Sequence, residues 1–155
     1  MKRIILIAII FGLGSPLAAQ EIQKVMESRA REMHRVIGLS DKELWKKFMK
    51  ENYTQALIDK PMRAVTETSG NGSTNSSSTS QPKSTDNLEA KAAMFQRLHD
   101  DFGKSKILSI TPADGKVEMV VKNEDGLGGT FILKFEKNKP YLIEGLGIEV
   151  QDIDR

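Results

Sequence analysis

Leu88–Val150 is the stretch that decides the fold, and it reads LEAKAAMFQRLHDDFGKSKILSITPADGKVEMVVKNEDGLGGTFILKFEKNKPYLIEGLGIEV. Its first part has apolar residues at the three- and four-residue spacing of a helix with one buried face: Leu88, Ala92, Phe95, Leu98 and Phe102. The remainder resembles four short strands separated by turns. We therefore expect an α+β fold in which this helix packs across a four-stranded antiparallel sheet, so that each buries the apolar face of the other.

The four strands are expected at 107–111, 116–122, 130–136 and 141–150. The first ends at Pro112, and Gly115 supplies the turn residue that needs a positive φ. The two central strands alternate, and their inward residues are Val117, Met119, Val121, Phe131, Leu133 and Phe135. In the last strand the apolar parity changes around Gly145 and Gly147, which predicts a β-bulge that curves the sheet.

Two further helices are predicted before this stretch, at 21–37 and 41–53. Gly38 ends the first, and Ser40 with Glu43 forms a capping box at the start of the second. The two helices form an α-hairpin whose apolar faces share one core with the sheet. The signal weakens after residue 53, where 56–58 fits either the tail of a helix or a short edge strand.

Residues 68–87 consist almost entirely of Ser, Thr, Asn, Gly, Gln and Pro. Such a segment buries too little apolar surface to offset its ordering entropy, so the sequence predicts a disordered insertion. It is either a neutral insertion in a surface loop or a functional segment, such as a flexible tether or a glycan-bearing loop.

The N-terminus has the three parts of a secretory signal peptide at 1–20. A basic start, Lys2-Arg3, precedes an apolar run from Ile4 to Leu13, and small residues follow at Leu17–Gln20. The apolar run is short for a transmembrane helix, although an uncleaved anchor is the alternative. We expect residues 21–155 to form a single exported domain, periplasmic or extracellular and of bacterial type, because the chain has no cysteine. No stable membrane anchor is expected after cleavage.

The charge balance excludes one class of partner. Removing residues 1–20 leaves 21 basic residues (23 minus 2) against 21 acidic ones. A chain of zero formal net charge has no general attraction to nucleic acid, so we expect no nucleic-acid partner.

No residues show a catalytic or metal-binding pattern, and no cofactor is expected. His99, Asp100 and Asp101 are consecutive on a helix and point in different directions, which favours a solvated helix face. His34 is interpreted as a surface histidine among basic residues. The glycines of 126–129 join two strands, so a hairpin connection is favoured over a phosphate-binding loop.

A concave apolar opening between the helices and a curved sheet is the remaining possibility for a site. The large residues that would line it are Trp45, Phe48, Phe102, Met119 and Tyr141. The same five residues serve a solid core equally well.

Two runs resemble a known family: Phe95–Lys104 (FQRLHDDFGK) and Pro140–Ile148 (PYLIEGLGI). Together with the alternating strands they resemble the NTF2-like (cystatin-like α+β) superfamily, and in particular the accessory module found N-terminal to secreted β-lactamase-related serine hydrolases. The helix at 44–52 and Pro61 fall where that module has its second helix and following turn. The resemblance implies a fold, and the catalytic residues of the hydrolase have no counterpart here.

Three functions follow as hypotheses. The first is an exported, non-catalytic module that binds a small apolar ligand, a peptide or an envelope protein. The second is a small NTF2-like enzyme with an unrecognised polar pocket. The third is an assembly module that forms a homodimer through the open face of the sheet.

Overall fold

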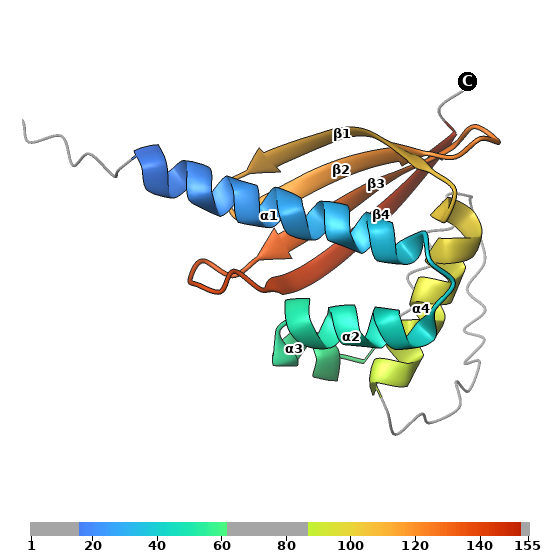
Figure 1. Ribbon diagram of the computed structural model, residues 1–155, viewed down its shortest axis with the longest axis horizontal. Helices are drawn as coiled ribbons and strands as arrows, with labels where there is room; N and C mark the ends of the chain where they lie inside the picture. The colour runs from blue at the N-terminus through green and yellow to red at the C-terminus, as the bar shows by residue number, and fades with distance from the viewer. Residues whose placement is uncertain (1–15, 62–86, 153–155) are drawn as a thin grey trace, which may run out of the picture.

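The computed structural model describes residues 16–61 and 87–152, which form helices on one face of a four-stranded sheet (Figure 1). The elements in chain order are α1 (Pro16–Ile37), α2 (Lys42–Asn52), α3 (Gln55–Asp59), α4 (Asn87–Phe102), β1 (Lys106–Ala113), β2 (Lys116–Lys122), β3 (Leu127–Phe135) and β4 (Ile143–Asp152). The sheet is antiparallel throughout, with its strands in the order β1-β2-β3-β4. The α+β fold predicted from the sequence is therefore confirmed.

One long helix lies across the sheet, and it is α1. This helix contacts β1 and β2, and its buried residues are Met26, Ala30, Met33, Val36 and Ile37. The sequence assigned this place to the helix at 88–102, now α4, and that part of the expectation is wrong. Instead α4 packs against α1, α2 and α3, and Phe102 at its end contacts Phe131 of β3 with ring centroids 5.4 Å apart.

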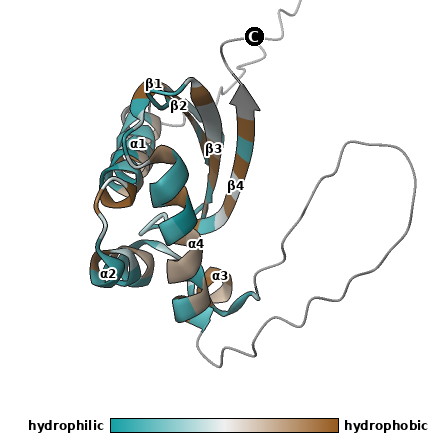
Figure 2. Cartoon of the chain, turned by 90° about the vertical axis from the view of Figure 1, so that its right-hand side faces the viewer, coloured by the Kyte–Doolittle hydropathy of each residue, from teal (hydrophilic) through white to brown (hydrophobic). Residues whose placement is uncertain are grey.

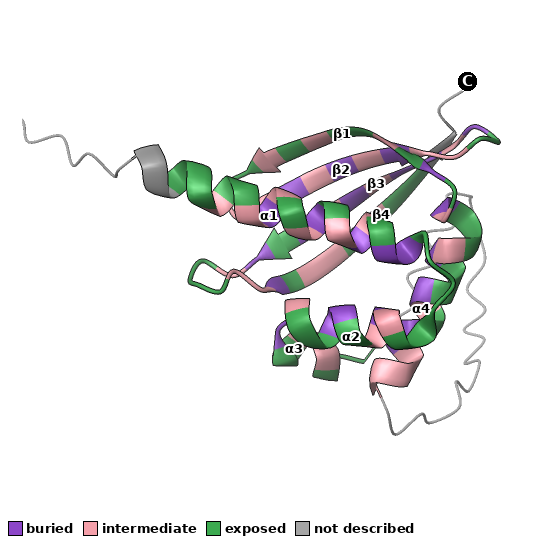
Figure 3. Cartoon of the chain, viewed as in Figure 1, coloured by how far each residue is buried: buried purple, intermediate pink, exposed green. Residues whose placement is uncertain are grey.

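The core lies between the helices and the inner face of the sheet (Figure 3). The inward residues predicted for β2 and β3 are all buried, with at most 2% exposure: Val117, Met119, Val121, Phe131, Leu133 and Phe135. Gly129 lies where α4 meets the sheet, and a Cβ atom there would come within 2.8 Å of the Phe102 ring. A glycine at this position lets the ring pack directly on the backbone of β3.

The junction between α1 and α2 differs from the prediction by one residue. Asp41, not Ser40, is the N-cap of α2, and its carboxylate accepts hydrogen bonds from the backbone N–H groups of Glu43 and Leu44. Asp and Ser are equally good N-cap residues, so the sequence alone does not choose between neighbours. Residues 56–58 are neither the tail of the second helix nor an edge strand, because they lie in a separate short helix, α3, whose N-cap Thr54 accepts a hydrogen bond from Leu57 N.

Two predicted segments fall largely outside the described residues. These are the signal peptide at 1–20, of which 1–15 lie outside, and the Ser/Thr-rich insertion at 68–87, of which 68–86 lie outside. Asn87, the last residue of the expected insertion, instead begins α4 and donates a hydrogen bond to Asp59 O at 3.0 Å.

The predicted bulge in the last strand is present, slightly N-terminal to its expected place. Phe135 pairs with Ile143 and Lys134 pairs with Gly145, so Glu144 is the extra residue. A second irregularity lies in β1 between Ile107 and Ser109. β1 also continues through Pro112, where the sequence ended it; a proline is tolerated because β1 is an edge strand.

Candidate functional site

The five predicted pocket residues occupy different environments. Trp45, Phe48, Phe102 and Met119 belong to the hydrophobic core, with at most 3% exposure. The Trp45 indole N–H donates to Val36 O at 2.7 Å, which satisfies its polar atom inside the core. Tyr141 lies apart from them, half-buried in the β3–β4 connection with a φ of 57°. Neither of the two surface depressions described below is lined by any of the five residues.

Both histidines connect helices, and the surface interpretation of each is wrong. His99 Nδ1 lies 2.8 Å from Ile37 O, so this nitrogen carries the proton and donates to the last turn of α1. His34 Nε2 lies 3.1 Å from Ser105 Oγ, which itself donates to Phe102 O at 2.6 Å. Burial lowers the pKa of His34. The two rings therefore join the end of α1 to the end of α4, while Asp100 and Asp101 are exposed as expected.

Two cations also connect elements. Arg29 of α1 donates to Asn52 Oδ1 at 3.0 Å and to Pro140 O at 2.8 Å, which links α1 to α2 and to the β3–β4 connection. Lys91 of α4 is buried and donates to Lys60 O, the C-cap of α3, at 2.6 Å. Burial lowers the pKa of Lys91. These groups hold the helices in place and lie outside both depressions.

No acid–base site is apparent in the described ranges. Burial raises the pKa of the Tyr53 hydroxyl. Two carboxyl groups in these ranges have a shifted pKa, Glu32 and Glu89, and the hydrogen bond from Arg35 lowers the pKa of Glu32. Within the same ranges no three His, Asp or Glu side chains are grouped in a way that holds a metal ion.

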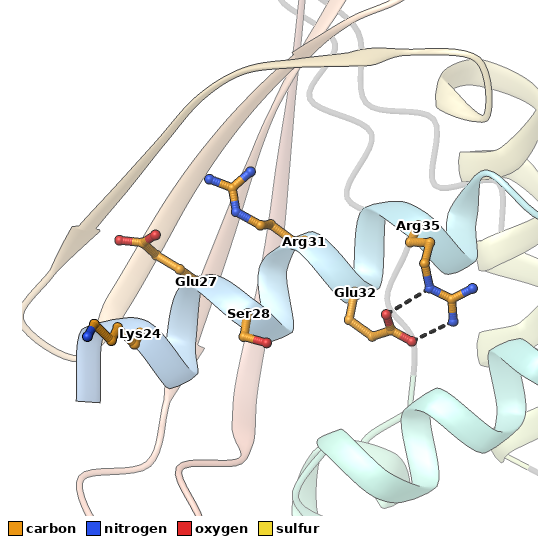
Figure 4. Close-up of a pocket in the computed structure, with 6 residues that line it drawn as sticks. All are labelled: Lys24, Glu27, Ser28, Arg31, Glu32 and Arg35. Atoms are coloured by element: carbon orange, nitrogen blue, oxygen red, sulfur yellow. Dashed lines mark hydrogen bonds and ion pairs between the residues drawn. The ribbon is translucent and has the colours of Figure 1, made fainter. Parts of the chain in front are cut away.

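The larger depression, about 530 Å³, runs along the exposed face of α1 (Figure 4). It is lined by Lys24, Glu27, Ser28, Arg31, Glu32 and Arg35. Glu32 accepts two hydrogen bonds from Arg35, at 2.8 and 2.6 Å. Residues of a single helix leave a ligand open to solvent on several sides, so this surface is best explained as a solvated helix face.

The smaller depression, about 340 Å³, lies where α3 meets the ends of β3 and β4. Its lining combines Thr54, Ala56 and Leu57 with four charged residues, Lys60, Lys134, Glu136 and Glu144. Two cations and two anions give it zero formal charge. Thr54 Oγ1 is engaged in capping α3, so this depression offers contact groups for a polar chain but no activated nucleophile.

The free edge of β4 adjoins this depression, and one end of the edge is paired with another segment of the same chain. Tyr53 pairs with Ile143 in a parallel bridge, and Thr54 N donates to Ile143 O at 2.9 Å. From Gly145 to Asp152, β4 pairs with β3 on one side, and the described residues place no strand on the other. Sequence reasoning missed this edge, although a final strand without lysine or proline was a signal for it.

The side chains of β4 differ between its two faces. On the helix side, Leu146 and Ile148 are half-buried against the core and Val150 is 59% exposed. The opposite side carries Gly145, Gly147 and Glu149. The edge therefore has an apolar row, formed by Leu146, Ile148 and Val150, that is partly uncovered. The backbone next to this row is accessible because Gly145 and Gly147 have no side chains.

The outer face of the sheet, where the sequence placed a homodimer, is uncovered by the described helices (Figure 2). It carries a Lys116–Glu118 ion pair at 2.6 Å beside half-buried Val120 and Ile132. This surface is mixed in polarity, and the homodimer through it stays a prediction.

No family model, no curated protein and no solved structure matches this chain. Its class is thus defined by geometry: an α+β domain with helices on one face of an open four-stranded antiparallel sheet. The NTF2-like resemblance stays a prediction. Among the described residues, no helix is both long and apolar enough to span a membrane.

Proposed function

We propose that this chain is an exported, non-catalytic binding or assembly module of the NTF2-like kind, which receives an extended segment at the free edge of β4. The observation that carries the proposal is the pairing of Tyr53 and Thr54 with Ile143, because it places one short partner on this edge already. A second segment that paired with the rest of the β4 edge would extend the sheet by main-chain hydrogen bonds, as in recognition by strand addition.

Export is supported by the layout of the first helix. Among the α1 residues whose exposure the structure describes, 19–37, the first buried one is Met26, after the cleavage position expected near Gln20. Cleavage there would leave every one of these buried residues in the mature chain. Mass spectrometry of the protein purified from its source would test this, and a mature chain that still begins at Met1 would contradict it.

The binding proposal is tested with peptides of about nine residues, selected by phage display against the purified chain. Selected peptides are then titrated into ¹⁵N-labelled protein, and amide shifts are followed by NMR. We expect the largest shifts along 145–151 of β4 and in Tyr53 and Thr54. Shifts confined to β1 or to the exposed face of α1, or a selection that yields no binder, would refute the proposal.

A matched pair of variants sharpens this experiment. Val150→Lys and Leu108→Lys place the same side chain on the two opposite edge strands, at positions that are 59% and 55% exposed. Only Val150→Lys should weaken peptide binding, because a lysine ammonium beside the apolar row of β4 must lose water when a strand docks. Equal effects of the two variants would show that the contact is not at β4.

A further inference from the structure

The two edges of the sheet differ in how well they resist a new strand. β1 carries features that protect an edge: an irregularity between Ile107 and Ser109, a proline at 112 and a lysine at 106. β4 has no lysine and no proline, and its bulge at Glu144 lies at the end where Tyr53 and Thr54 already pair. Natural proteins normally block an unused edge, so the contrast points to β4 as the edge that is used.

We propose that the segment received by β4 is the β4 of a second copy of this chain, paired antiparallel about a two-fold axis at Ile148. The inference rests on the proposed function, since it names the partner for the same edge. Two four-stranded sheets would join into one continuous sheet, with both helical layers on the same side.

The sequence of β4 is complementary to itself in this register. On the helix side, Ile148 faces its own copy, and Val150 faces Leu146 of the second copy. The most exposed apolar side chain of β4 is thereby covered by an apolar neighbour. On the other side, Glu149 faces Gly147, so no like charges lie directly opposite each other.

Other registers fit less well. An axis at Glu149 would place two glutamates directly opposite each other, which is unfavourable. An axis at Gly147 would leave only 145–149 paired. With the axis at Ile148, pairing extends over 145–151 and stops short of Ile143, where Tyr53 and Thr54 occupy the edge.

An edge-to-edge contact of this length is small, below the roughly 1,200 Å² typical of stable complexes. We therefore expect a weak dimer that forms at high protein concentration.

Single cysteines test the register, because the natural chain contains none. In Ile148→Cys the two Cα atoms would lie about 4.5–5.5 Å apart, within reach of a disulfide. In Val150→Cys they would be separated by four residues of strand, roughly 14 Å, which is too far. In a glutathione redox buffer, Ile148→Cys should form the disulfide-linked dimer at least about tenfold faster than Val150→Cys.

The same assay includes a matched control. Adding Val150→Lys to the Ile148→Cys chain should slow disulfide formation at least about fivefold, whereas adding Leu108→Lys on β1 should leave the rate unchanged. Equal rates for the two single cysteines, or a rate that Val150→Lys does not reduce, would overturn the proposal. Circular dichroism confirms that each variant is folded.

The unmodified protein provides an independent test if a cysteine variant does not fold. Amide hydrogen exchange along 145–151 should slow as protein concentration rises, while exchange along β1 stays constant; exchange that is independent of concentration would overturn the proposal. A failure of this dimer proposal can be distinguished from a failure of the proposed function. Peptides that shift β4 amides in a chain without β4–β4 pairing would leave the edge as a binding site and remove only the second copy as its partner.

Discussion

Replacing Tyr53 by phenylalanine is expected to stabilise the protein. The ring is buried, with 3% exposure, and it contacts Phe48 edge-to-face with centroids 5.9 Å apart. The hydroxyl has no hydrogen-bond partner among the described residues. A buried hydroxyl that lacks a partner costs about 1–3 kcal/mol, while the apolar ring contacts are retained in Tyr53→Phe. We expect a gain of about 1 kcal/mol in the free energy of unfolding, because the small void left by the oxygen offsets part of the relief.

The gain should depend on pH in a defined direction. Burial raises the pKa of Tyr53 above its ordinary value of about 10. In alkaline solution the unfolded chain therefore loses this proton before the folded protein does, and stability falls as pH rises through 10. Tyr53→Phe lacks that loss, so its advantage over the natural protein should be constant between pH 6 and 9 and should increase above pH 10.

The assay is urea denaturation followed by circular dichroism, with Tyr141→Phe as the control at a half-buried position. In thermal melts, about 1 kcal/mol corresponds to a rise in Tm of roughly 3–5 °C for a domain of this size. A Tyr53→Phe protein that is less stable than the natural one, or whose advantage shrinks above pH 10, would show that the hydroxyl is well solvated or hydrogen-bonded.

Three further predictions concern contacts among the helices and between the helices and the sheet. Gly129→Ala should destabilise the protein by about 1–3 kcal/mol in urea denaturation, because its Cβ would meet Phe102 at 2.8 Å; Gly147→Ala, whose nearest contact is 3.8 Å, is the control and should be close to neutral. Since burial lowers the pKa of His34, the stability that this residue contributes is present above about pH 6.5 and is lost as pH falls; His34→Gln should flatten the pH dependence of unfolding between pH 5 and 7, and an unchanged slope would contradict it. Lys91→Met removes the 2.6 Å hydrogen bond to the α3 C-cap and should cost about 1–3 kcal/mol, with faster amide exchange in α3; unchanged exchange there would argue against the proposed role.

The histidines show why the environment of a side chain is assigned wrongly when each helix is interpreted in isolation. His99 sits beside two acidic residues in sequence, and on an isolated helix its face is the polar one. In the folded chain the carbonyl of Ile37 at the end of α1 comes within 2.8 Å of His99, so the ring is drawn into a contact between helices. Nothing in the sequence near residue 99 reveals that α1 ends there.

The sequence by itself identified the inward faces of β2 and β3 and the main apolar faces of α1, α2 and α4. Alternation in β2 and β3 and the helical spacing in α1, α2 and α4 identify the inward faces, because side chains repeat every two residues in a strand and every 3.6 in a helix. The bulge in β4 was also predictable, since an extra residue reverses that alternation and leaves a visible mark in the sequence.

Only the tertiary structure decided which faces meet. It placed α1 rather than α4 across the sheet, enclosed four of the five candidate pocket residues in the core, and brought Tyr53 and Thr54 to Ile143 from ninety residues away. Apolar periodicity indicates that one face of an element is buried, but it does not indicate which other element covers that face, because hydrophobic burial is non-directional. The candidate site consists mainly of backbone at a strand edge, and backbone has no side-chain pattern that a sequence could reveal. The site is therefore defined only by the positions of the segments around that edge.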